Sequence, residues 1–234
     1  MLWIFRERTG FGKRRLCRLK NTKNKGLQEL IRANSLEDAK ITAYHIGFVL
    51  GPCINASGRL DTAARSLALL NAKTKEEAAR LAGDLTALNQ SRKALTEKGK
   101  EEAIRIIETT ELKNDRVLVV YLPDCHESLA GIIAGRIREK YHRPAFVLTG
   151  GETSAKGSGR SIESYSMYEE LVKCADLMIQ FGGHPMAAGL SIEEKNIEEF
   201  RRRLNVNCTL TDEELRPKIV IDVPMPVSYI TKDW

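Results

Sequence analysis

Two short motifs hold the residues whose types and spacing suit the binding of a phosphate group. The first is KGSGRS, residues 156–161, in which Ser158 and Arg160 lie two positions apart. In an extended strand such residues point to the same face, so a hydroxyl and a guanidinium can hold one phosphate. The flanking glycines let a ligand approach the backbone closely. The sequence therefore predicts a phosphate-binding pair on a strand.

The second motif is FGGHPMAAGLS, residues 181–191. Gly182 and Gly183 predict a tight turn with His184 at its apex, because glycine adopts turn conformations without steric cost. The small residues that follow leave room for another backbone or a flat base: Ala187, Ala188 and Gly189. Either motif alone also suits an ordinary turn, so it is their combination that indicates a binding site.

The composition indicates a globular protein without a membrane partner. The chain has 234 residues, 42% hydrophobic and 29% charged, which is enough for one large domain or two small ones. No apolar run approaches the roughly 18 residues of a membrane helix. The start, MLWIFRERTGFGKRR, places basic residues after a short apolar stretch, the reverse of a secretory signal. We therefore expect a cytoplasmic protein.

The cysteines and charges exclude two simple explanations of function. The five cysteines form no Cys-x-x-Cys pair, and Ala130 stands where a zinc-protease helix beginning at His126 needs its second histidine. Neither a disulfide framework nor a zinc site is expected. Residues 1–25 hold nine Lys or Arg against one Glu, a net charge of +8. Since the whole chain has a net charge of +6, residues 26–234 have a net charge of −2. Any polyanion must therefore be bound by local clusters.

The first half of the chain is expected to be helical. Residues 1–24 lack an apolar period and are interpreted as a flexible basic arm, and residues 25–33 as a helix. Ser35 and Asp38 have the spacing of a capping box that opens a helix into residues 46–50.

The stretch GPCINASGRL, residues 51–60, is predicted to be a compact irregular turn. Its Gly-Pro dipeptide would end the preceding helix, and the side chains of Asn55 and Arg59 could reach across it. Whether this turn is structural or contacts a ligand stays open at this point. Another helix is expected from Thr62.

A long helix is predicted between residues 74 and 112. Thr74 and Glu77 have the spacing of a capping box, and the stretch holds no proline. Unbroken, it would span roughly 58 Å and connect two domains. The alternative is two helices broken near Gly99.

A second domain with α/β character is expected from about residue 114. Residues 116–122 and 145–149 are apolar runs typical of buried strands, and the helix between them implies a parallel β-α-β unit. Further elements follow: strands at 154–161 and 187–192, a helix at 167–176, a last helix through Val206 capped by Ser191 and Glu194, and a strand from Lys218.

Four motifs carry a resemblance to a known family: GPCINASGRL, HESLAGIIAGRIREKYHRPAFVLT, KGSGRS and FGGHPMAAGLS. From about residue 21 the chain resembles the C-terminal portion of the RecJ family, bacterial single-stranded-DNA-specific 5′ to 3′ exonucleases of the DHH phosphoesterase superfamily. The resemblance implies an α/β fold, in which a long connecting helix precedes a DHH-associated domain with a mixed sheet flanked by helices.

The resemblance also divides the chain. It implies a basic leader outside the family match at 1–24, the end of the DHH catalytic domain at 25–73, the connecting helix at 74–113, the DHH-associated nucleic-acid-binding domain at 114–209 and the truncated start of an oligonucleotide-binding domain at 210–234. The leader is interpreted as a frameshifted or mis-started remnant.

Particular residues acquire roles from this resemblance. Ser158 and Arg160, with Gly159 between them, match family residues that hold a DNA phosphate at the 5′ end, and Arg59 matches an arginine that faces the cleft. Four more match family motif positions: Arg136, Gly182, Gly183 and His184, the last expected to contact the strand or shape the cleft. Cys53 departs from the arginine found in many relatives, so a second guanidinium is not expected here.

The metal site of the family has no counterpart in the sequence. The family cuts phosphodiesters with two manganese or magnesium ions, held by aspartates and by histidines of the DHH signature, all earlier than the position of Gly51. This chain has no Asp-His-His run, and its first aspartate is Asp38. Two-metal hydrolysis needs several carboxylates. We therefore expect no catalytic residue, metal ligand or cofactor in this chain.

The expected function is that of a fragment of a DNA repair and recombination exonuclease, inactive alone, that carries the DNA-binding part. Its expected partners are single-stranded DNA and, as a further candidate, a separate chain with the catalytic core. Two alternatives stay open: a stand-alone single-stranded nucleic-acid-binding module, and a relative that acts on short oligoribonucleotides or tRNA.

Overall fold

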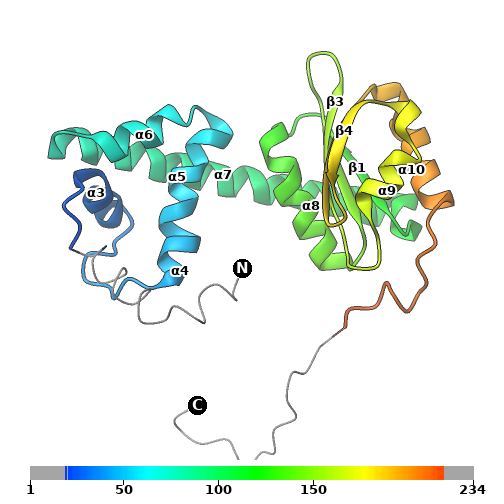
Figure 1. The fold of residues 1–234 in the computed structure, drawn as a ribbon, viewed down its shortest axis with the longest axis horizontal. Coiled ribbons are helices and arrows are strands. Elements are labelled where there is room, and N and C mark those ends of the chain that lie inside the picture. Colours follow the sequence, from blue (N-terminus) through cyan, green and yellow to red (C-terminus); the bar gives the residue numbers. More distant parts are fainter. Residues whose placement is uncertain (1–18, 20, 219–234) are drawn as a thin grey trace, which may run out of the picture. The chain divides into compact units, whose positions relative to one another are not determined.

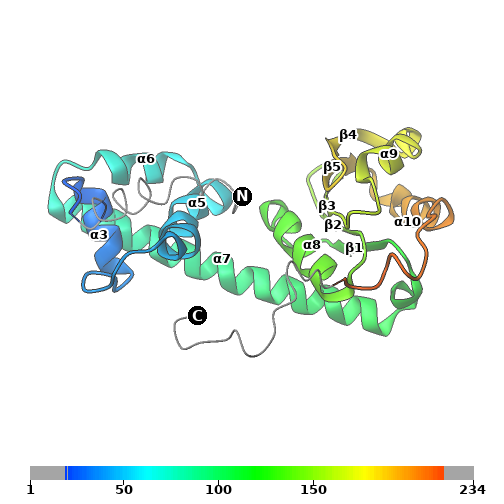
Figure 2. The same ribbon diagram turned by 60° about the horizontal axis from the view of Figure 1, so that its bottom comes forward.

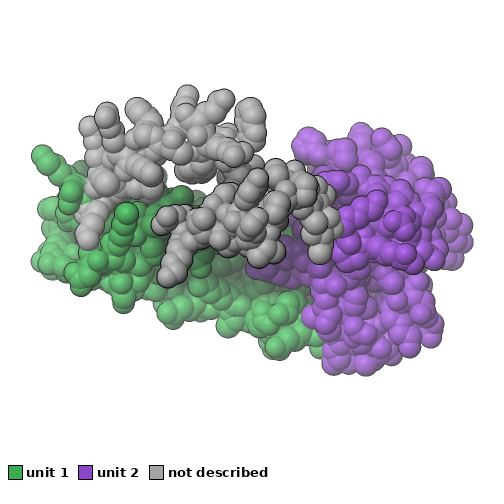
Figure 3. Space-filling model, turned by 90° about the horizontal axis from the view of Figure 1, so that it is seen from below, with its two compact units in different colours: residues 1–103, 124–133 green, residues 104–123, 134–234 purple. Residues whose placement is uncertain are grey.

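The computed structural model describes residues 19 and 21–218 of the chain. The chain divides into two compact units (Figure 3). Unit 1 comprises residues 1–103 and 124–133, and unit 2 comprises residues 104–123 and 134–234. Most of the leader expected at 1–24 lies outside the described residues. Almost all of the strand expected from Lys218 also lies outside them.

The described elements of unit 1 are helical (Figure 1). They are α3 (Lys25–Ala33), α4 (Ala43–His45), the π-helical η1 (Ile46–Leu50), α5 (Gly51–Leu60), α6 (Ala64–Asn71), the part of α7 (Lys75–Thr109) up to residue 103 and the part of α8 (Glu127–Tyr141) up to residue 133. Helices α3, η1, α5, α6 and α7 share one core, which includes the buried side chains of Leu30, Leu50, Leu69 and Leu85. The helix predicted at 25–33 is confirmed, and the Asn24 side chain caps it.

The capping box predicted at Ser35 and Asp38 is wrong. Ser35 has a φ of 56°, and its N–H donates to the carbonyl of Arg32 at 2.9 Å, so it belongs to the turn that ends α3. The next helix starts after Thr42, whose N–H donates to Nδ1 of His45 at 3.0 Å. The spacing of a capping box does not by itself establish a helix start, and here Ser35 lies in the turn after α3.

The irregular turn predicted at residues 51–60 is also wrong, because these residues form α5. Pro52 lies in the first turn of this helix, where its missing N–H is tolerated. Cys53, Ala56 and Ser57 lie at helical spacing and are buried in unit 1. The small residues therefore allow close helix packing, and they do not form a loop.

The long helix is continuous, so the alternative of a break near Gly99 is wrong. α7 runs over 35 residues, and Thr74 and Glu77 cap its start as predicted, with N–H to side-chain distances of 3.2 and 3.1 Å. A methyl group at Gly99 would lie 2.6 Å from Cδ1 of Ile133, which explains the glycine. None of the described helices, α7 included, has both the length and the apolar character of a membrane span.

Within the described residues, unit 2 holds a five-stranded mixed sheet (Figure 2). Its strands are β1 (Leu118–Leu122), β2 (Ala145–Thr149), β3 (Ala155–Arg160), β4 (Met178–His184) and β5 (Ala187–Ile192). They lie in the order β1-β2-β3-β5-β4; β1 and β2 are parallel, and the other neighbours are antiparallel. The predicted mixed sheet and its parallel pair are thereby confirmed.

Helices flank this sheet. They are η2 (Glu111–Asn114), the part of α8 (Glu127–Tyr141) from residue 134, α9 (Met167–Val172), η3 (Ala175–Leu177), η4 (Glu194–Asn196) and α10 (Ile197–Val206). α9 and α10 share a core with the sheet, in which Met167 and Phe200 pack with Phe146 and Leu190. The rings of Phe146 and Phe200 meet edge to face at 5.4 Å. We call the sheet face beneath α9 and α10 the packed face.

Two predictions for the C-terminal part of unit 2 are wrong. Gly182 and Gly183 lie within β4, a strand that the sequence did not predict, and the chain reverses one step later at Pro185 and Met186. Ser191 lies in β5 and caps no helix, since η4 and α10 begin only after that strand has ended. Gly182 and Gly183 adopt a strand conformation because they pair with β5, and two consecutive glycines do not predict a strand from the local sequence.

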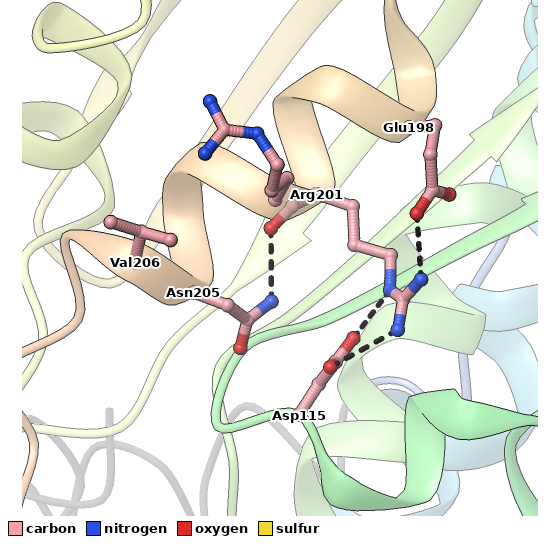
Figure 4. A pocket seen from close by; sticks show the side chains of 6 residues that line it. Asp115, Glu198, Arg201, Asn205 and Val206 are labelled. Atoms are coloured by element: carbon pink, nitrogen blue, oxygen red, sulfur yellow. Dashed lines mark hydrogen bonds and ion pairs between the residues drawn. The ribbon is translucent and has the colours of Figure 1, made fainter.

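A pocket of about 330 Å³ next to α10 is lined by residues that bond to each other and to the start of β1 (Figure 4). Arg201 donates to both carboxylate oxygens of Asp115, at 2.6 and 3.1 Å. Asn205 Oδ1 accepts from the N–H groups of Arg116 and Val117 at 2.9 and 3.0 Å. Because its charged groups pair with each other, this pocket joins α10 to the start of β1 and is not the candidate site.

The two glycines of α7 make a testable pair. Gly83 has no atom within 4 Å of the position of an added Cβ. Gly83→Ala should therefore raise the free energy of unfolding by about 0.5–1 kcal/mol, through helix propensity. Gly99→Ala should gain less or nothing, because Ile133 must move. Denaturant unfolding of both variants checks this; an equal gain in the two would contradict the packing described at Gly99.

Candidate nucleic-acid interface

Strands β3, β5 and β4 align polar and small residues in rows on one side of the sheet. Cross-strand pairing joins Arg160 to Ala187 and Ala187 to His184. Two further rows follow on the same side: Ser158 with Gly189 and Gly182, and Lys156 with Ser191 and Gln180. Because directly paired residues point to the same face, these nine positions share one surface, which we call the open face.

The intervening residues face the other way, into the core. A Cβ at Gly159 would lie 2.6 Å from both Sδ of Met167 and Cε1 of Phe146. A Cβ at Gly157 would lie 2.9 Å from Cγ of Leu190. These two glycines thus make room for packing beneath α9. The predicted contact of Gly159 with a phosphate stays a prediction, and only its backbone could make it.

Arg160 is held in place on the open face. Its guanidinium donates to Oγ of Ser158 at 3.1 Å and to the carbonyl of Gly159 at 2.7 Å. A Cβ at Gly135 of α8 would lie 4.0 Å from Cγ of Arg160, so the aliphatic part of the arginine runs against that helix. The structure thus brings a hydroxyl and a guanidinium together, half-buried and partly preorganised, as the binding of a phosphate requires.

His184 does not lie at the apex of a turn, as was predicted, but is the last residue of β4. It is exposed and one strand removed from Arg160, with Ala187 between them. At the usual spacing of neighbouring strands their Cα atoms are about 10 Å apart. Gly182 leaves open space beside it on the same face, whereas a Cβ at Gly183 would lie 2.5 Å from the carbonyl oxygen of Ala187.

A β-bulge in β4 keeps Gln180, Gly182 and His184 on the open face. The register of β4 against β5 shifts between Met178 and Gln180, so Ile179 is the extra residue. Met178 and Phe181 both pack against the core. Without the extra residue the strand could not bury both of these side chains and still present its polar positions outward.

Among the described residues, no hydrogen bond or ion pair joins Arg136 to the open face. Arg136 follows Gly135 on α8, is exposed, and pairs with Glu139 at 3.0 Å. A surface pair of this kind is weak, so a phosphate could displace the carboxylate.

Arg59 belongs to the other unit. It is exposed on α5 and donates to the carbonyl of Ser128 at 2.9 Å. Arg92 of α7, which donates to Oδ1 of Asn89 at 3.0 and 3.2 Å, is a further cation that the sequence did not single out. Burial first, and then the like charge of Arg59, lower the pKa of Arg92 below its usual value. Arg59 and Arg92 are therefore two guanidinium groups near enough in unit 1 to affect each other, although position 53 is a cysteine.

Lys156 of the KGSGRS motif was not among the residues predicted for the site, although it lies on the open face. Lys156, Ser158 and Arg160 are spaced two residues apart on β3 and therefore point to the same face. This alternation could have predicted Lys156 from the sequence. For Arg92 no such signal exists, because it is one of several cations along a long amphipathic helix.

The described residues do not form a metal site. Among residues 19 and 21–218, no group of three or more His, Cys, Asp and Glu side chains is placed to hold a metal ion. The donor set that two-metal hydrolysis needs is therefore not found in this part of the chain.

The sequence that forms the sheet of unit 2 matches a known domain family. Residues 114–208 match the family model described as the DHHA1 domain. This match includes β3, β4 and β5 and therefore the whole open face.

Curated relatives then identify the family as RecJ. The chain is 36% identical over 218 residues to the single-stranded-DNA-specific exonuclease RecJ of Salmonella typhimurium, covering 89% of this chain and 38% of that protein. It is 35% identical to the Bacillus subtilis protein of the same name, covering 92% of this chain and 28% of that protein. These similarities place the chain in the RecJ family, of which it matches the C-terminal region.

Solved structures agree with this assignment. RecJ from Thermus thermophilus in complex with Mg²⁺ superposes with a TM-score of 0.74 at 31% identity, over 83% of this chain and 30% of that one. A structure of exonuclease RecJ bound to manganese gives a TM-score of 0.72 at 31% identity, over 83% and 48%. The chain therefore spans less than half the length of each of these relatives.

Substitution of a glycine should affect stability differently on the two faces of the sheet. Gly159→Ala should lower the free energy of unfolding by about 1–3 kcal/mol, because the added methyl overpacks the core. Gly182→Ala places its methyl in open space and should leave stability nearly unchanged. Thermal and denaturant unfolding of the two variants measure the difference. Equal stability of both variants would show that the faces are assigned wrongly.

Proposed function

We propose that this chain holds single-stranded DNA for an exonuclease of the RecJ type, with the open face of unit 2 as the surface that binds the sugar-phosphate backbone. Hydrolysis itself, in this proposal, depends on a metal site that the described residues do not provide. The curated relatives are named single-stranded-DNA-specific exonucleases, and two of the solved relatives contain Mg²⁺ or manganese.

The observation that carries the proposal is the Ser158–Arg160 pair on the open face. A guanidinium that is already oriented by a neutral hydroxyl loses little freedom when it binds a phosphate. The nine positions of the open face hold no carboxylate, while Lys156, Arg160 and His184 supply cations or potential cations. The surface is thus locally positive, although residues 26–234 carry a net charge of −2.

The flat floor of this surface favours a single strand over a duplex. Ala187 and Gly189 are the central residues of their rows, and Gly182 ends the second row on β4, so a base or ribose can lie on these positions without meeting a bulky side chain. The described open face offers no aromatic side chain for stacking, so backbone contacts should dominate its affinity.

Arg160→Ala tests this proposal. The variant should bind a single-stranded oligonucleotide roughly 10- to 100-fold more weakly, because one charge-assisted contact is lost. The slope of log affinity against log salt should fall by about 0.7, the value for one phosphate contact on a single strand. Fluorescence anisotropy over a series of salt concentrations gives both quantities.

The matched control is Arg202→Ala, which makes the same change of charge on α10, over the packed face. Its affinity and salt slope should stay at the parent values, and Arg160→Lys should lie between the parent and Arg160→Ala. If the two alanine variants bind alike at every salt concentration, the open face does not hold the DNA. Competition by RNA that equals competition by DNA would show that the 2′-hydroxyl is not read.

The second part of the proposal predicts binding without cleavage. The purified chain, given a labelled single strand and Mn²⁺ or Mg²⁺, should retain the full-length oligonucleotide while anisotropy reports binding. Shortening that requires the metal and is removed by a chelator would contradict the proposal that the metal site lies elsewhere.

A further inference from the structure

Lys156 forms a second pair of cation and hydroxyl on the open face. Its Nζ donates to Oγ of Ser191 at 2.9 Å, and Gln180 completes the row on β4. Ser191 is buried, with 8% of its surface exposed, whereas Lys156 and Gln180 are exposed. The arrangement repeats the Ser158–Arg160 pair with different residues and across strands instead of along one.

The amine of Lys156 keeps its charge available. In the described part of the chain its hydrogen-bond partner is a neutral hydroxyl, and no ion pair involves it. The carboxylate nearest in sequence to Lys156 is Glu152, and the one nearest to Ser191 is Glu193; both lie beyond the strand ends, and Glu193 pairs with Lys195 at 2.5 Å. A lysine whose charge has no partner on a surface free of carboxylates can accept an external anion at small desolvation cost.

The spacing of the two pairs suits a chain of phosphates better than one phosphate. Lys156 and Arg160 are four residues apart on β3, which is about 13 Å along a strand, and Ser158 lies midway on the same face. The hydrogen bond of Lys156 to Ser191 holds its amine over β5, whereas Arg160 is held on Ser158 of β3, so the two pairs are separate positions for a phosphate. Between them, Gly189 and Gly182 leave the surface low.

We propose that Lys156, with Ser191 and Gln180, forms a second phosphate-binding subsite, so that the nucleic-acid backbone follows β3 from Arg160 to Lys156 across at least two separated phosphates. This inference rests on the proposed function, because it extends the same surface. If the inference is correct, the affinity depends on the length of the bound oligonucleotide as well as on its terminal phosphate.

The test compares ligands of two lengths. A 5′-phosphorylated dinucleotide can fill the Ser158–Arg160 site, whereas an oligomer of roughly ten nucleotides can reach both sites. Lys156→Ala should weaken binding of the longer oligomer about tenfold and lower its salt slope by about 0.7, with no change for the dinucleotide. Lys156→Arg should restore the longer oligomer, and Lys173→Ala, which follows α9 on the packed side, should change neither ligand.

The outcomes separate the two proposals. If Arg160→Ala weakens both ligands but Lys156→Ala weakens neither, the second subsite is wrong while the proposed function stands. If Lys156→Ala weakens the dinucleotide as much as the oligomer, there is one site and no track along β3. If Arg160→Ala affects neither ligand, the proposed function itself fails.

Discussion

The register of three antiparallel strands is the constraint on which the candidate site depends. Pairing of β3 with β5 and of β5 with β4 sends alternate residues to opposite faces, so Arg160, Ala187 and His184 lie in one row while Gly159 and Ala188 turn to the core. A slip by one residue would bury Arg160 and expose the packing positions. Such a slip would be costly because Gly159 packs tightly against Met167 and Phe146. Packing in the core therefore determines which side chains lie on the open face.

The proposed binding of a polyanion by this surface would depend on local, short-range contacts. Excess positive charge lies in the first 25 residues, and the remainder of the sequence is slightly negative, so the field of the body of the protein does not attract a polyanion. What remains is two pairs of hydrogen-bonding side chains on the open face: Ser158 with Arg160 along β3, and Lys156 of β3 with Ser191 of β5. In unit 1, Arg59 and Arg92 offer two more guanidinium groups, which belong to a separate compact unit.

Local sequence patterns predicted those parts of the fold that local physics determines. The helix at 25–33 and the strand at 145–149 coincide with α3 and β2, because each has its own cap or a continuous apolar run. α5 was taken for a turn and β4 was not predicted, because glycine and proline are ambiguous until neighbouring elements are in place. The same holds for the site: strand parity indicated that Ser158 and Arg160 share a face, whereas the packing role of Gly159 depends on Met167 and Phe146, which the sequence does not place beside it.

The most direct test of the central claim is a map of the DNA-binding surface at residue resolution. In a ¹H–¹⁵N NMR titration with a single-stranded oligonucleotide, amide shifts should change most along residues 156–160, 180–184 and 187–191. Changes should be small in α9 and α10, which cover the packed face. The largest changes falling on α9 and α10, with the three strands unaffected, would contradict the assignment of the open face as the surface that holds the DNA.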